Sequence, residues 1–122
     1  MVEYLSPEGG AILKVVVDHI RGGNVDPNRP ETFISYKEIH DLLNLSLMGD
    51  TYGNSLSNQG LEDLVDWANK NGFPAITGLI INKTTSTPGK GYFEWFGRDE
   101  YDFGWWKNQM KQSLEFNWDE YL

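Results

Sequence analysis

The chain has 122 residues, with 10 basic and 18 acidic side chains, a formal charge of −8 and no cysteine. This length fits one domain with its own core. The lack of cysteine excludes a disulfide framework, a thiol nucleophile and a thiolate metal site. The charge is opposite to the basic footprint typical of nucleic-acid-binding domains. No apolar run approaches the length of a membrane span, so we expect no membrane association and a cytoplasmic location.

The first predicted element is a helix over residues 6–22. Ser6 can act as its N-cap, and Pro7 suits the first helical position. Gly22-Gly23 would end it. The β-branched run Val15–Val17 also fits a strand, but the capping residues favour a helix. The apolar face of this helix comprises Ile12, Val15, Val16 and Ile20.

A second helix is predicted after the loop Asn24–Glu31 and a short extended piece, Thr32–Ile34. Ser35, followed three residues later by Glu38, forms a capping box, so the helix should begin there and end near Asn44. We expect it to leave His40 in solvent and to bury Ile39, Leu42 and Leu43. Tyr36 would stand at the first helical position, where its ring can be exposed.

Residues 54–71 are predicted to form the third helix, and Gly72 stands where a C-terminal capping glycine belongs. One face carries Leu61, Leu64, Val65 and Ala68 at helical spacing. The carboxylates of Glu62, Asp63 and Asp66 lie towards the other face. We interpret these carboxylates as a solvated helix surface rather than as a metal site or an acid–base pair.

The stretch from Ala75 to Phe96 is predicted to form a β-hairpin with a long polar tip. Ala75–Asn82 is apolar and rich in isoleucine, whereas Tyr92–Phe96 alternates aromatic and acidic residues. Pro88-Gly89 and Gly91 favour turns between the two strands. A last helix over residues 99–114, capped by Asp99, would place Trp106, Met110 and Leu114 on one face.

Aromatic residues gather in the C-terminal part of the chain, where eleven of them lie between Tyr92 and Tyr121. One interpretation is that they close the C-terminal half onto the rest of the core, with Trp95, Trp106 and Trp118 as the large contacts. The alternative is an aromatic surface that anchors a protein partner or stacks on bases. The residues predicted for partner binding are Phe116, Trp118 and Tyr121.

Two segments, FISYKEI at residues 33–39 and FPAITGLII at residues 73–81, are separated by a polar helix and followed by a glycine-containing hairpin. This order resembles the winged-helix domain of O6-alkylguanine-DNA alkyltransferases and alkyltransferase-like proteins, over residues 33–93. The resemblance implies a helix that supports a DNA recognition helix, with Tyr36 turning the target nucleotide out. The chain also resembles small uncharacterised bacterial and prophage proteins, some of them encoded beside restriction or defence genes.

The chain departs from the alkyltransferase pattern at both chemically important positions. The family's Pro-Cys-His-Arg motif would fall on residues 74–77, where Ala75 replaces the alkyl-accepting cysteine. The arginine that the family inserts into the base stack has no counterpart around Asn54-Ser55-Leu56. Alkyl transfer is therefore excluded, and the chain lacks the arginine that would take the place of the flipped nucleotide in the base stack.

From these features we predict an α+β fold with a winged-helix-like core of three helices and a β-hairpin, in a single domain with its core at residues 6–96 and an aromatic extension at 97–122. The predicted function is that of a non-enzymatic protein that binds a protein partner, in a phage–host or defence setting, with no cofactor and no metal. The alternatives are a winged-helix nucleic-acid-binding protein and an enzyme of unknown reaction. The residues predicted to contact nucleic acid are Tyr36, Lys37, Asn54, Ser55, Asn58, Gln59, Lys83 and Lys90.

Overall fold

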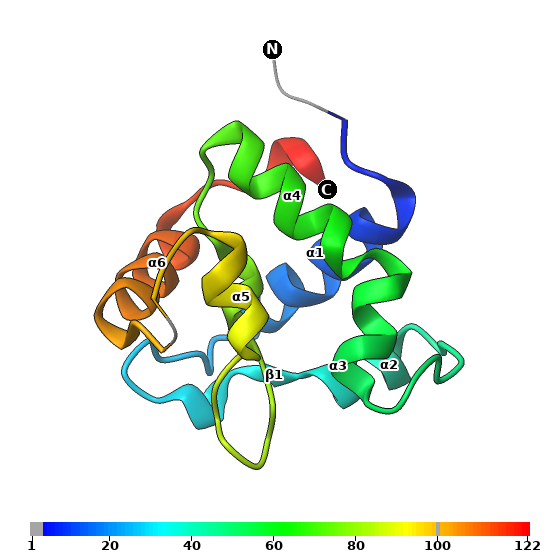
Figure 1. Cartoon of the computed structure of the whole chain (residues 1–122). Helices are drawn as coiled ribbons and strands as arrows, with labels where there is room; N and C mark the ends of the chain where they lie inside the picture. The colour runs from blue at the N-terminus through cyan, green and yellow to red at the C-terminus, as the bar shows by residue number, and fades with distance from the viewer. Residues whose placement is uncertain (1–3, 100) are drawn as a thin grey trace.

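The computed structural model describes residues 4–99 and 101–122, and it is a mixed fold of helices and a small parallel sheet (Figure 1). Short 3₁₀ turns cover Pro30–Thr32, Ile76–Leu79 and Asp119–Tyr121. The main elements are α1 (Pro7–Arg21), β1 (Ile34–Ser35), α2 (Tyr36–Leu42), α3 (Tyr52–Leu56), α4 (Glu62–Asn71), β2 (Ile80–Ile81), α5 (Lys90–Trp95) and α6 (Phe103–Glu115).

The capping signals predicted for α1, for α2 and for the end of α4 are confirmed. The Ser6 hydroxyl accepts a hydrogen bond from the Gly9 N–H at 3.1 Å and starts α1. In α2, Ser35 Oγ accepts from the Glu38 N–H at 3.0 Å, and Glu38 Oε1 accepts from the Ser35 N–H at 3.3 Å. Gly72 ends α4 with a left-handed φ of 68°. The prediction that Leu42 is buried is wrong, since this side chain is 67% exposed at the end of α2.

The helical stretch predicted over residues 54–71 is interrupted by a π turn, Ser57–Leu61, which separates α3 from α4. Gly60 adopts a φ of 122°, which residues with a side chain rarely adopt. A Cβ atom at Gly60 would lie 2.7 Å from the carbonyl carbon of Glu8. The turn therefore lets the start of α1 lie directly against the α3–α4 connection.

The predicted β-hairpin is wrong, and the winged-helix arrangement is not confirmed. β2 pairs in parallel with β1, with Ile34 opposite Ile80, and not with residues 92–96. Residues 90–95 form α5 instead, because Tyr92 and Phe93 are both buried although they are neighbours. Adjacent residues of a strand point to opposite faces, whereas a helix can turn both towards one core. The loop between β2 and α5 projects at the bottom of Figure 1 and closes on itself through the Asn82 N–H and the Thr87 carbonyl, 2.8 Å apart.

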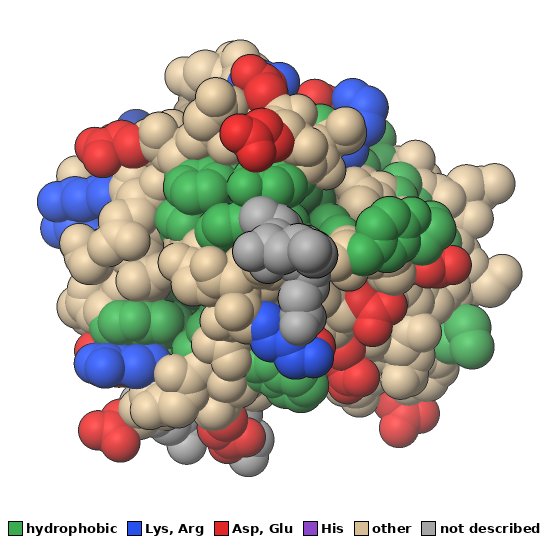
Figure 2. Space-filling model, turned by 90° about the horizontal axis from the view of Figure 1, so that it is seen from above, with side chains coloured by type: hydrophobic (Ala, Val, Ile, Leu, Met, Phe, Trp, Pro, Cys, Tyr) green, Lys and Arg blue, Asp and Glu red, His purple; other side chains and the backbone are tan. Residues whose placement is uncertain are grey.

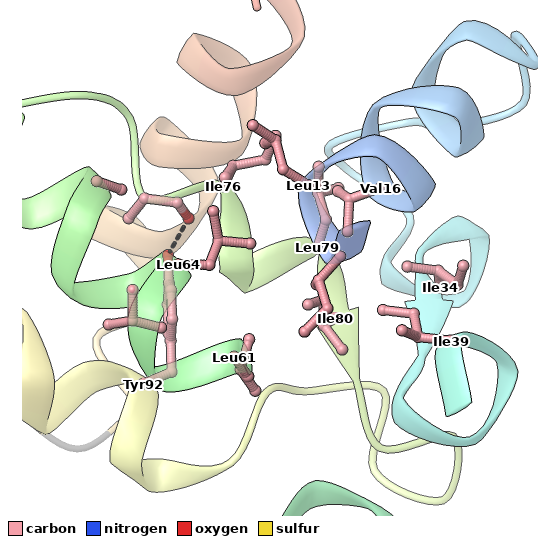
Figure 3. Close-up of a cluster of buried hydrophobic side chains, with 14 of the residues drawn as sticks. Leu13, Val16, Ile34, Ile39, Leu61, Leu64, Ile76, Leu79, Ile80 and Tyr92 are labelled. Carbon is pink, nitrogen blue, oxygen red and sulfur yellow. Dashed lines mark hydrogen bonds between the residues drawn. The ribbon is translucent and has the colours of Figure 1, made fainter. Parts of the chain in front are cut away.

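The core lies around the two short strands (Figure 3). Ile34 and Ile80 bring β1 and β2 together, and α1 contributes Leu13 and Val16 from one side. The apolar face predicted for α4 and the residue before it is confirmed, since Leu61, Leu64, Val65 and Ala68 are all buried.

The C-terminal helix begins later than predicted, because Asp102 and not Asp99 provides its cap, accepting from the Trp105 N–H at 3.2 Å. Trp106 of α6 is buried and donates its indole N–H to the Gly78 carbonyl at 2.9 Å. Among the described residues, no helix has the length and apolar character needed to cross a membrane.

Candidate functional site

A cleft of about 880 Å³ opens beside the carboxyl ends of the two parallel strands. Ser35 and Ile81, the last residues of β1 and β2, both line it. Its walls come from the first turns of α2, from α3, from the start of α4, and from α5 with the residues before it. In open α/β sheets, which are much larger than this pair of two-residue strands, ligands bind in crevices outside the carboxyl ends of the strands.

Four aromatic side chains line this cleft: Tyr36, Tyr52, Tyr92 and Trp95. Tyr36 Oη accepts a hydrogen bond from the Gly89 N–H at 3.0 Å, which links α2 to the start of α5. Tyr92 donates its hydroxyl to the Ala75 carbonyl at 2.9 Å, the bond drawn in Figure 3. Burial raises the pKa of Tyr36 and, more strongly, the pKa of Tyr92, so both phenols are neutral at pH 7. Trp95 is 45% exposed and forms part of the rim.

The charged side chains of the cleft are arranged in pairs. Lys37 Nζ lies 2.9 Å from Asp41 Oδ2, and Lys83 Nζ lies 3.0 Å from Glu38 Oε1. The hydrogen bond to Asp41 raises the pKa of Lys37. Glu62 adds a third carboxylate. Among the described side chains that line the cleft, carboxylates therefore outnumber lysines, and each of these lysines already has an anionic partner.

Thr77 supplies an unsatisfied polar group to the cleft lining. The residue is 4% exposed, and its hydroxyl has no hydrogen-bond partner within the described part of the chain. Buried hydroxyl groups are bonded in the large majority of cases, so an unpaired one requires an explanation. One explanation is that a ligand in the cleft supplies the missing hydrogen bond of the Thr77 hydroxyl.

A buried polar network supports the wall formed by α2 and α3. The expectation that His40 is solvated is wrong: the side chain is 2% exposed, and its Nε2 lies 2.7 Å from Ser55 Oγ. Ser55 Oγ also accepts from the Met48 N–H at 2.7 Å and from Gln59 Nε2 at 3.0 Å. A histidine beside a serine can form a nucleophilic pair. Here the serine is fully buried and holds the loop before α3 in place, so the pair is structural.

The structure brings part of the predicted nucleic-acid set together. Tyr36, Lys37, Asn54 and Lys83 line the cleft. Ser55 is buried behind its wall, Asn58 is exposed, and Gln59 bonds to the Ser46 carbonyl at 2.9 Å. Lys90 begins α5, but its side chain lies outside the described part of the structure.

The three residues predicted for partner binding lie elsewhere, in a cluster that also contains two aromatic residues from α4 and the segment after it. Trp118 is buried, whereas Phe116 and Tyr121 are partly buried. We call this group the C-terminal aromatic cluster; it consists of Trp67, Phe73, Phe116, Trp118 and Tyr121.

Several cleft residues were not predicted from the sequence, among them Tyr52, Thr77, Tyr92 and Trp95. Tyr52 follows Thr51, whose hydroxyl caps α3 by accepting from the Asn54 N–H at 3.0 Å. Threonine is a preferred N-cap residue, so Thr51 could have indicated that Tyr52 begins a helix. Thr77 stands out only as the polar member of an apolar run.

Comparison of the chain with protein-family models, with curated proteins and with solved structures finds no match. Within the described residues, no group of three or more histidine, aspartate or glutamate side chains is arranged to hold a metal ion.

Proposed function

We propose that this protein is a non-enzymatic interaction protein whose cleft binds a short segment of a partner protein. The observation that carries the proposal is the combination of aromatic walls with lysines that are already neutralised by carboxylates. Such a cleft offers contact area for an apolar or aromatic side chain and little attraction for phosphate. Pockets that enclose and desolvate an anchor side chain provide most of the binding energy in protein interfaces.

The size and charge of the molecule support the same function. A cleft of about 880 Å³ falls within the range that encloses a ligand of several side chains. The formal charge of −8 favours a neutral or basic partner and repels nucleic acid at long range. On the face shown in Figure 2, lysine and arginine side chains are interspersed with carboxylates and apolar patches rather than gathered together.

The experiment compares two glycines that lie in helices. Gly53 lines the cleft, and an ideal Cβ atom there would come no closer than 3.9 Å to any neighbouring atom, including the Tyr36 ring. Gly53→Leu should therefore fill the cleft without displacing the backbone. Gly10 in α1 has nothing within 4 Å of its Cβ position, so Gly10→Leu is a matched control away from the cleft.

Peptides are selected on the immobilised full chain from a random phage-displayed library, and their affinity is then measured by calorimetry. We expect the selected peptides to bind Gly10→Leu as they bind the unmodified protein, and Gly53→Leu at least about tenfold more weakly, a loss of about 1.4 kcal/mol. Equal binding to both variants would show that the cleft is not the binding site.

A second candidate function is nucleic-acid binding, because four residues predicted for that role line one cleft. A salt titration of duplex and single-stranded DNA binding tests it, since phosphate contacts make affinity fall as salt rises. Binding at low salt that Lys83→Met weakens would favour this function. Lack of binding at low salt would exclude it. A phage–host or defence setting stays a prediction from the sequence resemblance.

A further inference from the structure

We infer that the cleft selects a cationic side chain, an arginine of the partner segment, and that Lys37 occupies its position in the unliganded protein. This inference rests on the proposed function, because it names the chemistry of the group that enters the same cleft.

The position of Lys37 is the first observation behind the inference. Its ammonium group lies 2.9 Å from Asp41 Oδ2 and 5.8 Å from the centroid of the Tyr52 ring. A carboxylate beside an aromatic face is an arrangement that attracts cations. The protein therefore already binds a cation at this point of the cleft wall, and it supplies that cation itself.

The Lys37–Asp41 pair can be opened by a competitor. Both side chains are about 60% exposed, and exposed ion pairs contribute little net stability. An incoming guanidinium group could therefore replace the ammonium group against Asp41 and Tyr52 while Lys37 turns into solvent. A guanidinium group also stacks on aromatic rings and pairs with carboxylates through two parallel hydrogen bonds, which an ammonium group cannot do.

The rest of the lining favours a cation over an anion. Glu38 and Glu62 add two carboxylates, and Lys83 is held by Glu38 at 3.0 Å. A ligand anion would meet these carboxylates, whereas a cation would be attracted by them.

Thr77 is an independent observation, because its buried hydroxyl on the cleft lining has no partner among the described residues. A donor group of the bound partner segment would satisfy this hydroxyl oxygen. At the carboxylate of Asp41 itself, the fork of N–H donors of arginine fits better than the ammonium group of lysine.

The first arm of the test uses two capped amino acids as probes, acetyl-arginine-amide and acetyl-citrulline-amide. Citrulline has the shape of arginine without the charge. In NMR titrations of the full chain, we expect the arginine probe to shift the signals of residues 36–41 and 51–54 and of the Trp95 indole. The citrulline probe should not shift them at the same concentration, and equal shifts from both probes would overturn the inference.

The second arm compares Lys37→Met with Lys14→Met. Lys14 forms a similar exposed pair with Asp18, four residues along α1 and 3.1 Å away, so both substitutions change the net charge equally. We expect Lys37→Met to bind the arginine probe about threefold more tightly, because the internal competitor is gone, and Lys14→Met to bind it unchanged. Asp41→Asn should weaken binding, whereas Asp18→Asn should not. Equal affinities of Lys37→Met and Lys14→Met would overturn the inference.

The outcomes for this inference and for the proposed function are separable. Peptides that bind in a Gly53-dependent manner but contain no arginine would leave the proposed function in place and refute the cationic ligand. In the opposite outcome, the arginine probe binds Lys37→Met more tightly, but the selected peptides bind Gly53→Leu as they bind the unmodified protein. The cleft would then be a small cation site, and the peptide-binding function would be refuted.

Discussion

The cleft and the C-terminal aromatic cluster are both rich in aromatic residues, but they differ in how far their rings are covered. In the C-terminal aromatic cluster, the rings contact one another, with centroids 4.4 Å apart for Phe116 and Trp118 and 5.0 Å apart for Trp67 and Phe73. In the cleft, Tyr36, Tyr52 and Trp95 lie among carboxylates and lysines around an opening of about 880 Å³. The same residue types thus seal one part of the surface and leave another part available to a ligand.

The difference comes from where each polar group finds its partner. The Trp118 indole N–H donates to the Ser113 carbonyl at 2.9 Å, so the ring can be buried without an unsatisfied donor. Arg21 of α1 also forms an exposed ion pair with Asp119, in the tail that carries this ring. In the cleft, Thr77 lacks such a partner among the described residues. Aromatic density is therefore common to both regions, whereas an open cleft with an unsatisfied buried hydroxyl distinguishes the one that we propose to bind a partner.

The largest expected effect is that of Trp118→Ala, which removes a side chain that is 2% exposed. We expect the free energy of unfolding to fall by about 3–5 kcal/mol, because transfer energy is lost and a cavity remains. Urea denaturation measures this loss. Trp95→Ala at the cleft rim is the control, with an expected loss of about 1–2 kcal/mol, since this ring is 45% exposed. Equal losses for the two variants would contradict the contrast between a sealed and an open region.

Gly78→Ala tests the contact between the cleft wall and α6, the helix that leads into the C-terminal aromatic cluster. A Cβ atom at Gly78 would lie 2.5 Å from Tyr92 Oη and 2.7 Å from Met110 Cε, so the cleft wall and α6 would both have to move. We expect a loss of about 1–3 kcal/mol from overpacking. Gly10→Ala, in open space on α1, should instead stabilise the protein by up to about 1 kcal/mol. If thermal denaturation gives the same melting temperature for Gly78→Ala and the unmodified protein, the packing around Gly78 is loose.

Ser55→Ala tests whether the buried network sets the shape of the open cleft. The substitution removes the partner of His40 and of the Met48 N–H. Leaving such buried groups unsatisfied should lower the free energy of unfolding by about 1–3 kcal/mol. Hydrogen exchange of the Met48 amide should accelerate as well. Ser57→Ala, on the same stretch but lining the cleft, is the control, and slow exchange at Met48 in Ser55→Ala would refute the role of the network.

Local signals in the sequence predicted the helix ends well. Ser6, Ser35 with Glu38, and Gly72 act through hydrogen bonds or backbone angles within a few residues, so neighbouring residues are enough to reveal them. The β1–β2 pairing depends on contacts between distant segments, and each strand has only two residues, too few for a recognisable pattern.

Only part of the cleft could be predicted from the sequence, because local signals are visible there and contacts between distant segments are not. Tyr36 and Lys37 begin a helix whose capping box is visible in the sequence, and they were predicted as site residues. Tyr92 was assigned to a strand because its segment alternates aromatic and acidic residues. The burial of both Tyr92 and its neighbour Phe93 against one core decides for a helix, and it is visible only in three dimensions.

The smallest expected effect concerns the charge pairs of the cleft and is a change in pH dependence. Burial by itself would raise the pKa of Glu38, but hydrogen bonds from Lys83 and Ser35 outweigh it and leave this pKa below its usual value. A carboxyl group whose pKa is lower in the folded state stabilises the fold above its unfolded pKa of about 4.3, and this contribution is lost as the pH falls through the lower value.

Lys83→Met removes one of the hydrogen bonds that lower the pKa of Glu38, so the pKa should rise in carboxyl NMR titrations. The part of the acid-induced fall in the free energy of unfolding that comes from Glu38 should then become smaller. At pH 7 the free energy of unfolding should change by less than about 1 kcal/mol, since both side chains are about half exposed. Lys14→Met changes the net charge equally and should leave the pKa of Glu38 unchanged. If the pKa of Glu38 is the same in Lys83→Met as in the unmodified protein, the Lys83–Glu38 pair is not formed in solution. Lys83 would then be free to attract an anionic ligand, and nucleic-acid binding would become the better proposal for the cleft.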